Sequence, residues 1–117
     1  LEPARLDVVL FESADDESRT FVKRIIGLPG ETVQIVDGAV LIDGEAASLP
    51  DGLDLAAIPG LAKDPVTLEE NEYFMLGDNR DSSEDSRFVN VGKVNRSQIV
   101  GKIWLRVSPL SELGLIQ

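Results

Sequence analysis

A lysine in an apolar stretch, Lys23, is one residue of this sequence that could carry out acid–base chemistry, because it lies between Val22 and the pair Ile25-Ile26. If its side chain points into a core, the loss of hydration disfavours the ammonium form and lowers the pKa of the amine. A general base near neutral pH requires roughly 3–5 kcal/mol of such destabilisation of the charged form. The simpler interpretation places Lys23 and Arg24 on a solvated strand edge, where charged strand residues usually lie.

A second candidate is the polar segment 78–87, which contains only Asp, Asn, Arg, Glu and Ser. Side chains of these types readily form short-range networks, and an exposed loop with Asx turns and surface ion pairs is the simplest interpretation. A calcium loop is an alternative, because hard cations bind several carboxylates. However, Ser86 stands where such a loop needs Gly, and Gly92 stands where its closing Glu is expected.

Composition removes several other chemistries. The sequence has no cysteine and no histidine, so thiol chemistry and imidazole bases are excluded, and acid–base work falls to Lys, a carboxylate or Tyr. A formal net charge of −10, from 21 acidic and 11 basic residues, argues against nucleic-acid binding. No apolar run is long enough to span a bilayer as a helix. We expect no metal and no cofactor.

The elements that must position these candidates are mostly strands. Runs rich in β-branched and aromatic residues, bounded by polar residues, glycine or proline, predict strands at 7–11, 19–26, 32–36, 39–42, 73–76, 91–94 and 100–107. Pro29-Gly30 fits a type II turn, and Asp37-Gly38 fits a type I′ hairpin turn. The predicted class is mainly β, with small twisted antiparallel sheets, hairpins and little helix. Residues 1–117 form a single domain in this interpretation, with 45–66 as an irregular insertion or loop.

Three segments, in this order, resemble sequence boxes of the bacterial type I signal peptidase family. Lys-Arg-Ile-Ile-Gly-Leu-Pro-Gly-Glu (23–31) is similar to the lysine box, and Gly-Asp-Asn-Arg-Asp-Ser-Ser-Glu-Asp-Ser-Arg (77–87) to the carboxy-terminal box, with Ser82 where Asn is common. Arg-Leu-Asp-Val-Val-Leu-Phe (5–11) resembles the preceding strand box, which usually has Gly where this sequence has Leu6. The likeness covers most of the chain except 45–66 and implies a signal peptidase-like β fold.

The resemblance implies a serine endopeptidase with a Ser–Lys dyad. Lys23 then corresponds to the general base, and Ser83 to the hydroxyl that orients the lysine. Asp85 and Arg87 match the ion pair that shapes the site behind the lysine.

Further positions follow from the same resemblance. Arg24 and Asp78 match supporting residues of the site. Phe21 and Val22 lie on the strand that lines the substrate pockets for small residues before the cleavage point. Backbone pairing along that strand would hold a peptide extended.

The implied partners are the signal peptides of exported preproteins and a membrane surface. The implied location is the plasma membrane, with the catalytic domain on its extracytoplasmic face. In the family, the nucleophile lies in a Ser-Met-x-Pro box upstream of the strand box, near the end of a membrane-spanning segment. No serine of this sequence is followed by methionine. We therefore expect the nucleophilic serine and the anchor to lie upstream of Leu1, and the chain to be inactive on its own.

Two other readings remain open. One is a related Ser–Lys protease, either a maturation peptidase of the pilus or conjugative type or a self-cleaving repressor, although repressors lack the 77–87 box. The other is a non-enzymatic acidic β-domain that binds a protein or calcium. The enzyme interpretation requires Lys23 Nζ and Ser83 Oγ to lie within hydrogen-bond distance, despite their separation in sequence.

Overall fold

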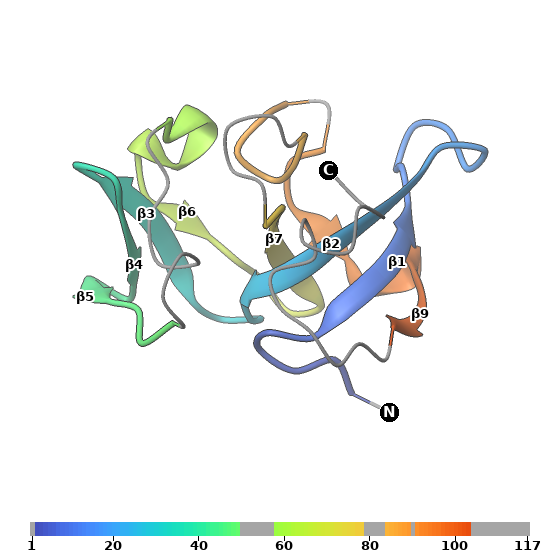
Figure 1. Cartoon of the computed structure of the whole chain (residues 1–117), viewed down its shortest axis with the longest axis horizontal. Coiled ribbons are helices and arrows are strands. Elements are labelled where there is room, and N and C mark those ends of the chain that lie inside the picture. The colour runs from blue at the N-terminus through green and yellow to red at the C-terminus, as the bar shows by residue number, and fades with distance from the viewer. Residues whose placement is uncertain (1, 50–57, 79–83, 90, 104–117) are drawn as a thin grey trace.

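The described residues of the chain fold into two antiparallel sheets, one of five strands and one of four (Figure 1). The computed structural model describes residues 2–49, 58–78, 84–89 and 91–103. The strands are β1 (Val8–Glu12), β2 (Thr20–Gly27), β3 (Thr32–Val36), β4 (Ala39–Ile42), β5 (Glu45–Ala46), β6 (Val66–Thr67), β7 (Glu72–Leu76), β8 (Val94–Asn95) and β9 (Ile99–Ile103), and the short 3₁₀ helices are η1 (Gly60–Lys63) and η2 (Arg96–Gln98). The mainly β prediction is confirmed.

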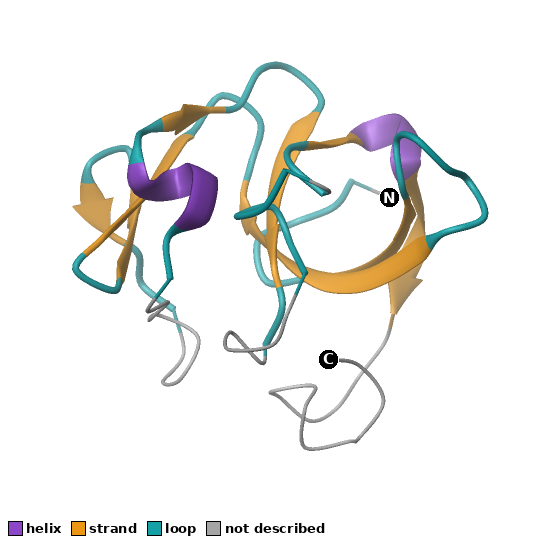
Figure 2. Ribbon diagram, turned by 90° about the horizontal axis from the view of Figure 1, so that it is seen from above, coloured by secondary structure: helices purple, strands orange, loops and turns teal. Residues whose placement is uncertain are grey.

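The first sheet has the strand order β8-β7-β2-β1-β9, so β2 is its central strand. β1 and β2 form a hairpin in which Val8 lies opposite Arg24 and Glu12 opposite Thr20. Burial rises along β2, from exposed Thr20 at the hairpin loop to buried residues from Lys23 onward. Figure 2 shows this sheet strongly curved. The inner half of β2 therefore passes through the protein interior.

The second sheet has the order β5-β4-β3-β6 and is built from tight hairpins. Asp37 and Gly38 both have positive φ, 50° and 84°, as the predicted type I′ turn between β3 and β4 requires. Asp43 and Gly44, at 53° and 85°, repeat this geometry between β4 and β5. Asp-Gly sequences therefore set the register of three consecutive strands.

A tight turn connects the two sheets. The Glu31 N–H donates to the Leu28 carbonyl oxygen at 3.1 Å, and Gly30 has a φ of +86°, which agrees with the type II turn predicted at Pro29-Gly30. Arg5 reinforces this connection, because its Nη1 and Nη2 donate to the two carboxylate oxygens of Glu31 at 2.8 and 2.6 Å. The start of the chain is thereby fixed to the junction between the sheets.

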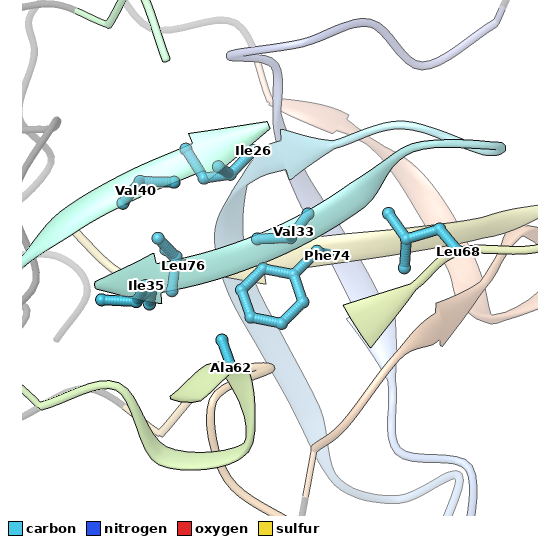
Figure 3. Packing of buried hydrophobic residues seen from close by; sticks show 8 residues of the cluster. All are labelled: Ile26, Val33, Ile35, Val40, Ala62, Leu68, Phe74 and Leu76. Carbon is cyan, nitrogen blue, oxygen red and sulfur yellow. The ribbon is translucent and has the colours of Figure 1, made fainter. Parts of the chain in front are cut away.

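The hydrophobic core consists of two clusters that share β2 and β7. Strand alternation sends Phe74 and Leu76 into one cluster and Tyr73 and Met75 into the other. The first cluster, shown in Figure 3, fills the space around the second sheet with Ile26, Val33, Ile35, Val40, Ala62, Leu68, Phe74 and Leu76. The second lies against the first sheet and contains Val9, Phe11, Ile25, Tyr73, Met75 and Val94. Both faces of β2 and β7 are therefore covered.

Some predicted boundaries differ from the observed ones. The strand expected at 91–94 is only Val94–Asn95, because the chain forms a turn at Val91, whose N–H donates to the Phe88 carbonyl. The strand expected at 100–107 begins at Ile99, and its residues beyond 103 lie outside the described part of the chain. Within 45–66, expected to be irregular, the structure contains β5, η1 and the start of β6, while 50–57 are not described.

Candidate active site

Lys23 is buried in the middle of the first sheet. It lies opposite Val9 of β1, and the residue is only 4% exposed. Arg24 is 8% exposed. A solvated strand edge is therefore the wrong interpretation, because Lys23 is buried and the pairing of β2 with β7 begins at the next residue, Arg24, which lies opposite Leu76.

Burial lowers the pKa of the Lys23 amine below its ordinary value, because desolvation penalises the ammonium. The negative charges of Asp85, Glu84 and Asp78 act in the opposite direction, and the positive charge of Arg87 adds to the lowering. Desolvation outweighs the carboxylates. A larger fraction of the amine is therefore neutral at a given pH than in an exposed lysine, as a general base requires.

Asp85 and Arg87 form a completely buried ion pair next to this lysine. Arg87 Nε donates to Asp85 Oδ1 at 2.9 Å and Nη2 donates to Oδ2 at 3.0 Å, and both side chains have 0% exposure. The Gly77 N–H, directly after β7, also donates to Asp85 Oδ2 at 3.0 Å. Both carboxylate oxygens are thus bound within the protein, which leaves Asp85 poorly suited to the calcium loop considered above. Among the described residues, no cluster of three or more acidic side chains could hold a metal ion.

Arg24 and Asp78 form a second bidentate ion pair, at the end of β7. Arg24 Nε and Nη2 donate to the two carboxylate oxygens at 3.0 and 2.8 Å, and these side chains are 9% and 1% exposed. Arg24 Nη1 donates to the Leu6 carbonyl at 3.0 Å. Leu6 has a φ of +76°, a conformation that explains why glycine is usual at this position in the family it resembles. The pair connects β2 to the end of β7 and to the start of β1.

Ser83, expected to orient the lysine, lies outside the described residues, as do 79–82. The separation of Lys23 Nζ and Ser83 Oγ therefore stays a prediction. The chain is described again from Glu84, whose carboxylate accepts a hydrogen bond from Arg19 Nη2 at 3.2 Å. Asp85, two residues after Ser83, acts electrostatically on Lys23. The segment 77–87 therefore lies near the start of the segment 23–31.

Phe21 and Val22 lie on the outer half of β2, opposite Phe11 and Leu10 of β1. The Phe21 ring stacks on Phe11 with centroids 5.5 Å apart, and the Arg19 guanidinium lies 5.2 Å from the Phe21 centroid. Both residues are half-buried. They precede Lys23 on the same strand, where a bound peptide could extend toward the amine.

Sequence reasoning missed two features of the site. Ser86 is buried, and its Oγ accepts a hydrogen bond from the Met75 N–H at 2.8 Å, while its own N–H donates to the Met75 carbonyl at 3.0 Å. These bonds hold the polar segment against β7. Arg87 also contacts the backbone of 58–61, within the stretch that the resemblance did not cover. Neither residue type nor spacing indicates such contacts, because they depend on the tertiary fold.

A cavity of about 260 Å³ lies elsewhere, lined by Pro3, Val9, Arg96 and residues 99–102. None of the predicted site residues lines it. In the described part of the chain, no helix has the length and hydropathy to cross a bilayer.

Comparison with known proteins identifies the class. The family model for signal peptidase, peptidase S26, matches residues 1–108. The chain therefore belongs to the signal peptidase family of peptidases, peptidase S26.

Individual members of this family are similar over nearly the whole chain. A probable signal peptidase I-2 of Synechocystis is 34% identical over 98% of this chain and 53% of its own length. A signal peptidase I of Leptolyngbya laminosa is 35% identical, over 96% of this chain and 56% of the relative. The chain thus spans about half the length of these relatives.

A solved structure supports the same fold. The crystal structure of a signal peptidase I from Enterococcus faecalis aligns with a TM-score of 0.66 and 29% identity. The alignment covers 89% of this chain and 98% of that one. The signal peptidase-like β fold implied by the sequence is confirmed.

Proposed function

We propose that this chain is the catalytic region of a Ser–Lys endopeptidase that removes signal peptides from exported preproteins. The observation that carries the proposal is the buried Lys23 on the central strand, whose amine has a lowered pKa. Asp85, Arg87 and Asp78, members of two buried ion pairs, act on this amine electrostatically. Membership of the signal peptidase family supports the substrate class. The site would act at the extracytoplasmic face of the plasma membrane.

In the proposed reaction, the neutral amine of Lys23 removes the proton from a serine hydroxyl as the serine oxygen attacks the scissile carbonyl carbon. The resulting ammonium then donates this proton to the leaving amine as the C–N bond breaks, which leaves an ester on the serine. Lys23 next removes a proton from the water molecule that attacks the ester. Collapse of the second intermediate breaks the ester bond, and the lysine ammonium returns its proton to the serine oxygen. The product leaves as a carboxylic acid, which ionises in water to the new carboxylate.

The surrounding residues have supporting roles in this proposal. Ser83 supplies a hydroxyl that forms a hydrogen bond with the Lys23 amine and so orients the amine. The Asp85–Arg87 pair fixes the polar segment that carries Ser83, and the Arg24–Asp78 pair fixes the strand that carries Lys23. Phe21 and Val22 contact the small residues before the cleavage point, with the peptide extended along β2.

The nucleophile in this proposal is a serine outside these 117 residues, because no serine in the sequence is followed by methionine as in the Ser-Met-x-Pro box. The chain by itself would then leave a signal-peptide substrate uncut. Lys23 would supply the base, and the attacking oxygen would come from that serine.

Fusion of the Ser-Met-x-Pro segment of a signal peptidase I relative before residue 1 tests this function. We expect the fused protein to cleave a signal-peptide substrate and the 117-residue chain not to. Lys23→Met should lower the cleavage rate of the fusion by about 10²–10⁴-fold, the usual contribution of a general base. Lys93→Met is the matched control, since Lys93 is an exposed lysine paired with Glu72. Full activity of the Lys23→Met fusion, or turnover by the unfused chain, would contradict the proposal.

A further inference from the structure

Arg87 is bound from two directions by the segment 58–61. Its Nη1 donates to the Ile58 carbonyl oxygen at 3.0 Å, and its own carbonyl oxygen accepts a hydrogen bond from the Leu61 N–H at 2.6 Å. These bonds are additional to the three that Arg87 makes with Asp85, two from its guanidinium and one from its backbone N–H. Both the side chain and the backbone of Arg87 are therefore fixed by a segment distant in sequence.

Gly60 makes this close approach possible. Its φ is +56°, and a Cβ atom at this position would overlap the Arg87 carbonyl oxygen and lie 2.9 Å from the Arg87 carbonyl carbon. A side chain here would push the backbone of Arg87 away, because the obstacle is main chain and not the end of a flexible side chain. Glycine is the residue without that atom.

The segment that holds Arg87 is itself fixed to the second sheet. Ala62 has 0% exposure and belongs to the cluster shown in Figure 3. The Lys63 carbonyl accepts a hydrogen bond from Gln34 Nε2 of β3 at 3.1 Å. Both overall views place η1 beside the loop that follows residue 84 (Figures 1 and 2). A continuous set of contacts thus leads from the second sheet through η1 to Arg87 and Asp85.

We propose that Gly60 and the backbone N–H of Leu61 are positioning elements of the active site, which hold Arg87, and through it the Asp85 carboxylate, in the place from which both charges act on the Lys23 amine. The catalytic part of this inference rests on the proposed function; the structural part does not. The charged groups that act on the Lys23 amine are Asp85, Glu84, Asp78 and Arg87. Displacing Arg87 changes two of these groups together, since Asp85 loses its partner.

The titration of Lys23 in the 117-residue chain tests the inference without any cleavage assay. Gly60→Ala should raise the pKa of Lys23, because a displaced Arg87 frees the Asp85 charge and admits water beside the amine. Gly92→Ala is the matched control, because Gly92 has a similar φ of +62° but open space where its Cβ would stand. An identical Lys23 titration in the two folded variants would overturn the inference.

A second pair of variants tests the same contact from Leu61, in case Gly60→Ala does not fold. Leu61→Pro removes the N–H that binds the Arg87 carbonyl, in the first turn of a 3₁₀ helix where proline is tolerated. Leu61→Ala keeps this N–H and removes only a half-exposed side chain. We expect the Lys23 titration to move upward in Leu61→Pro and to stay in place in Leu61→Ala. Equal titrations would contradict the inference.

Cleavage by the fused enzyme separates this inference from the proposed function. Gly60→Ala should lower kcat by about tenfold to a hundredfold, the range for a slightly misplaced catalytic group, with KM unchanged. A shifted Lys23 titration together with full activity of Lys23→Met would refute the proposed function and leave the positioning of Lys23 supported. An unshifted titration together with an inactive Lys23→Met would refute the positioning alone.

Discussion

Arg87 binds Asp85 through two parallel hydrogen bonds, of 2.9 and 3.0 Å, and neither side chain is exposed to solvent. Two residues apart in sequence, they form a charged pair in the interior, next to a lysine that burial has made less basic. Such a pair stabilises a protein little compared with apolar residues, but the loss of one partner leaves an uncompensated charge. In this protein the pair fixes the geometry of residues 84–87, whose charges act on Lys23.

Removal of Arg87 tests how strongly the fold depends on this pair. Arg87→Met should lower the free energy of unfolding by about 3–5 kcal/mol, since Asp85 would stay buried without its partner. Urea denaturation measures the change. Arg19→Met is the control, because its pair with Glu84 is half-exposed, at 51% and 57%, and exposed pairs contribute about 0–1 kcal/mol. Equal losses in the two variants would contradict the buried pair's importance.

Arg24→Lys tests the second ion pair. Lysine keeps the charge but cannot reproduce the bidentate contact with Asp78 and the bond to the Leu6 carbonyl. We expect a loss of about 1.5–3 kcal/mol in the free energy of unfolding, the range for hydrogen bonds that involve a charged group. Urea denaturation beside Arg19→Lys, whose guanidinium is exposed, gives the comparison. A fully stable Arg24→Lys protein would show that charge alone suffices.

Gly27→Ala tests the close packing where β2 leaves the first sheet. An added Cβ would lie 2.6 Å from Val33 Cγ2, 2.8 Å from Leu68 Cδ1 and 3.0 Å from Phe74 Cβ. Overpacking of this kind costs about 1–3 kcal/mol. Gly101→Ala, in β9, is the control, because nothing lies within 4 Å of its added Cβ. Thermal unfolding should separate the two variants, and a Gly27→Ala protein as stable as Gly101→Ala would disprove the packing argument.

The pH dependence of stability follows from the lowered pKa of Lys23. Between the pKa of the folded state and the ordinary pKa of lysine, 10.5, the unfolded chain binds more protons than the folded one. The free energy of unfolding must then rise with pH in this window, by at most about 1.4 kcal/mol per pH unit, and be independent of this group below it. Relative to Lys23→Met, the wild-type protein should gain stability as the solution becomes more alkaline. Parallel curves for the two proteins would argue against the buried amine.

Local sequence signals predicted the hairpins well but could not decide the environment of Lys23. The Asp37-Gly38 turn acts between adjacent strands, so composition and spacing were enough. Whether β2 is a central or an edge strand depends on its pairing with β7, where Ile25 lies opposite Met75 across a long stretch of sequence. A lysine between apolar residues has the same sequence pattern on a central strand and on an edge strand, so the pattern cannot show whether the lysine is buried.

Of the contacts that position the site, the sequence predicted only some, because the others depend on the tertiary fold. The resemblance in sequence boxes predicted the Asp85–Arg87 ion pair, and it gave Arg24 and Asp78 as supporting residues without pairing them. In the structure both pairs are in bidentate contact. The contacts of Arg87 with Ile58 and Leu61 involve a stretch without recognisable pattern. They use backbone atoms, which leave no signature in residue types except the glycine at position 60.

The central claim is that Lys23 is a buried, weakly basic amine, and an NMR titration of ¹³Cε-labelled lysines tests it most directly. The missing signal in Lys23→Met assigns the resonance. The account predicts that Lys23 titrates below the ordinary value for lysine. A Lys23 that titrates at the ordinary value, or above it, would contradict it.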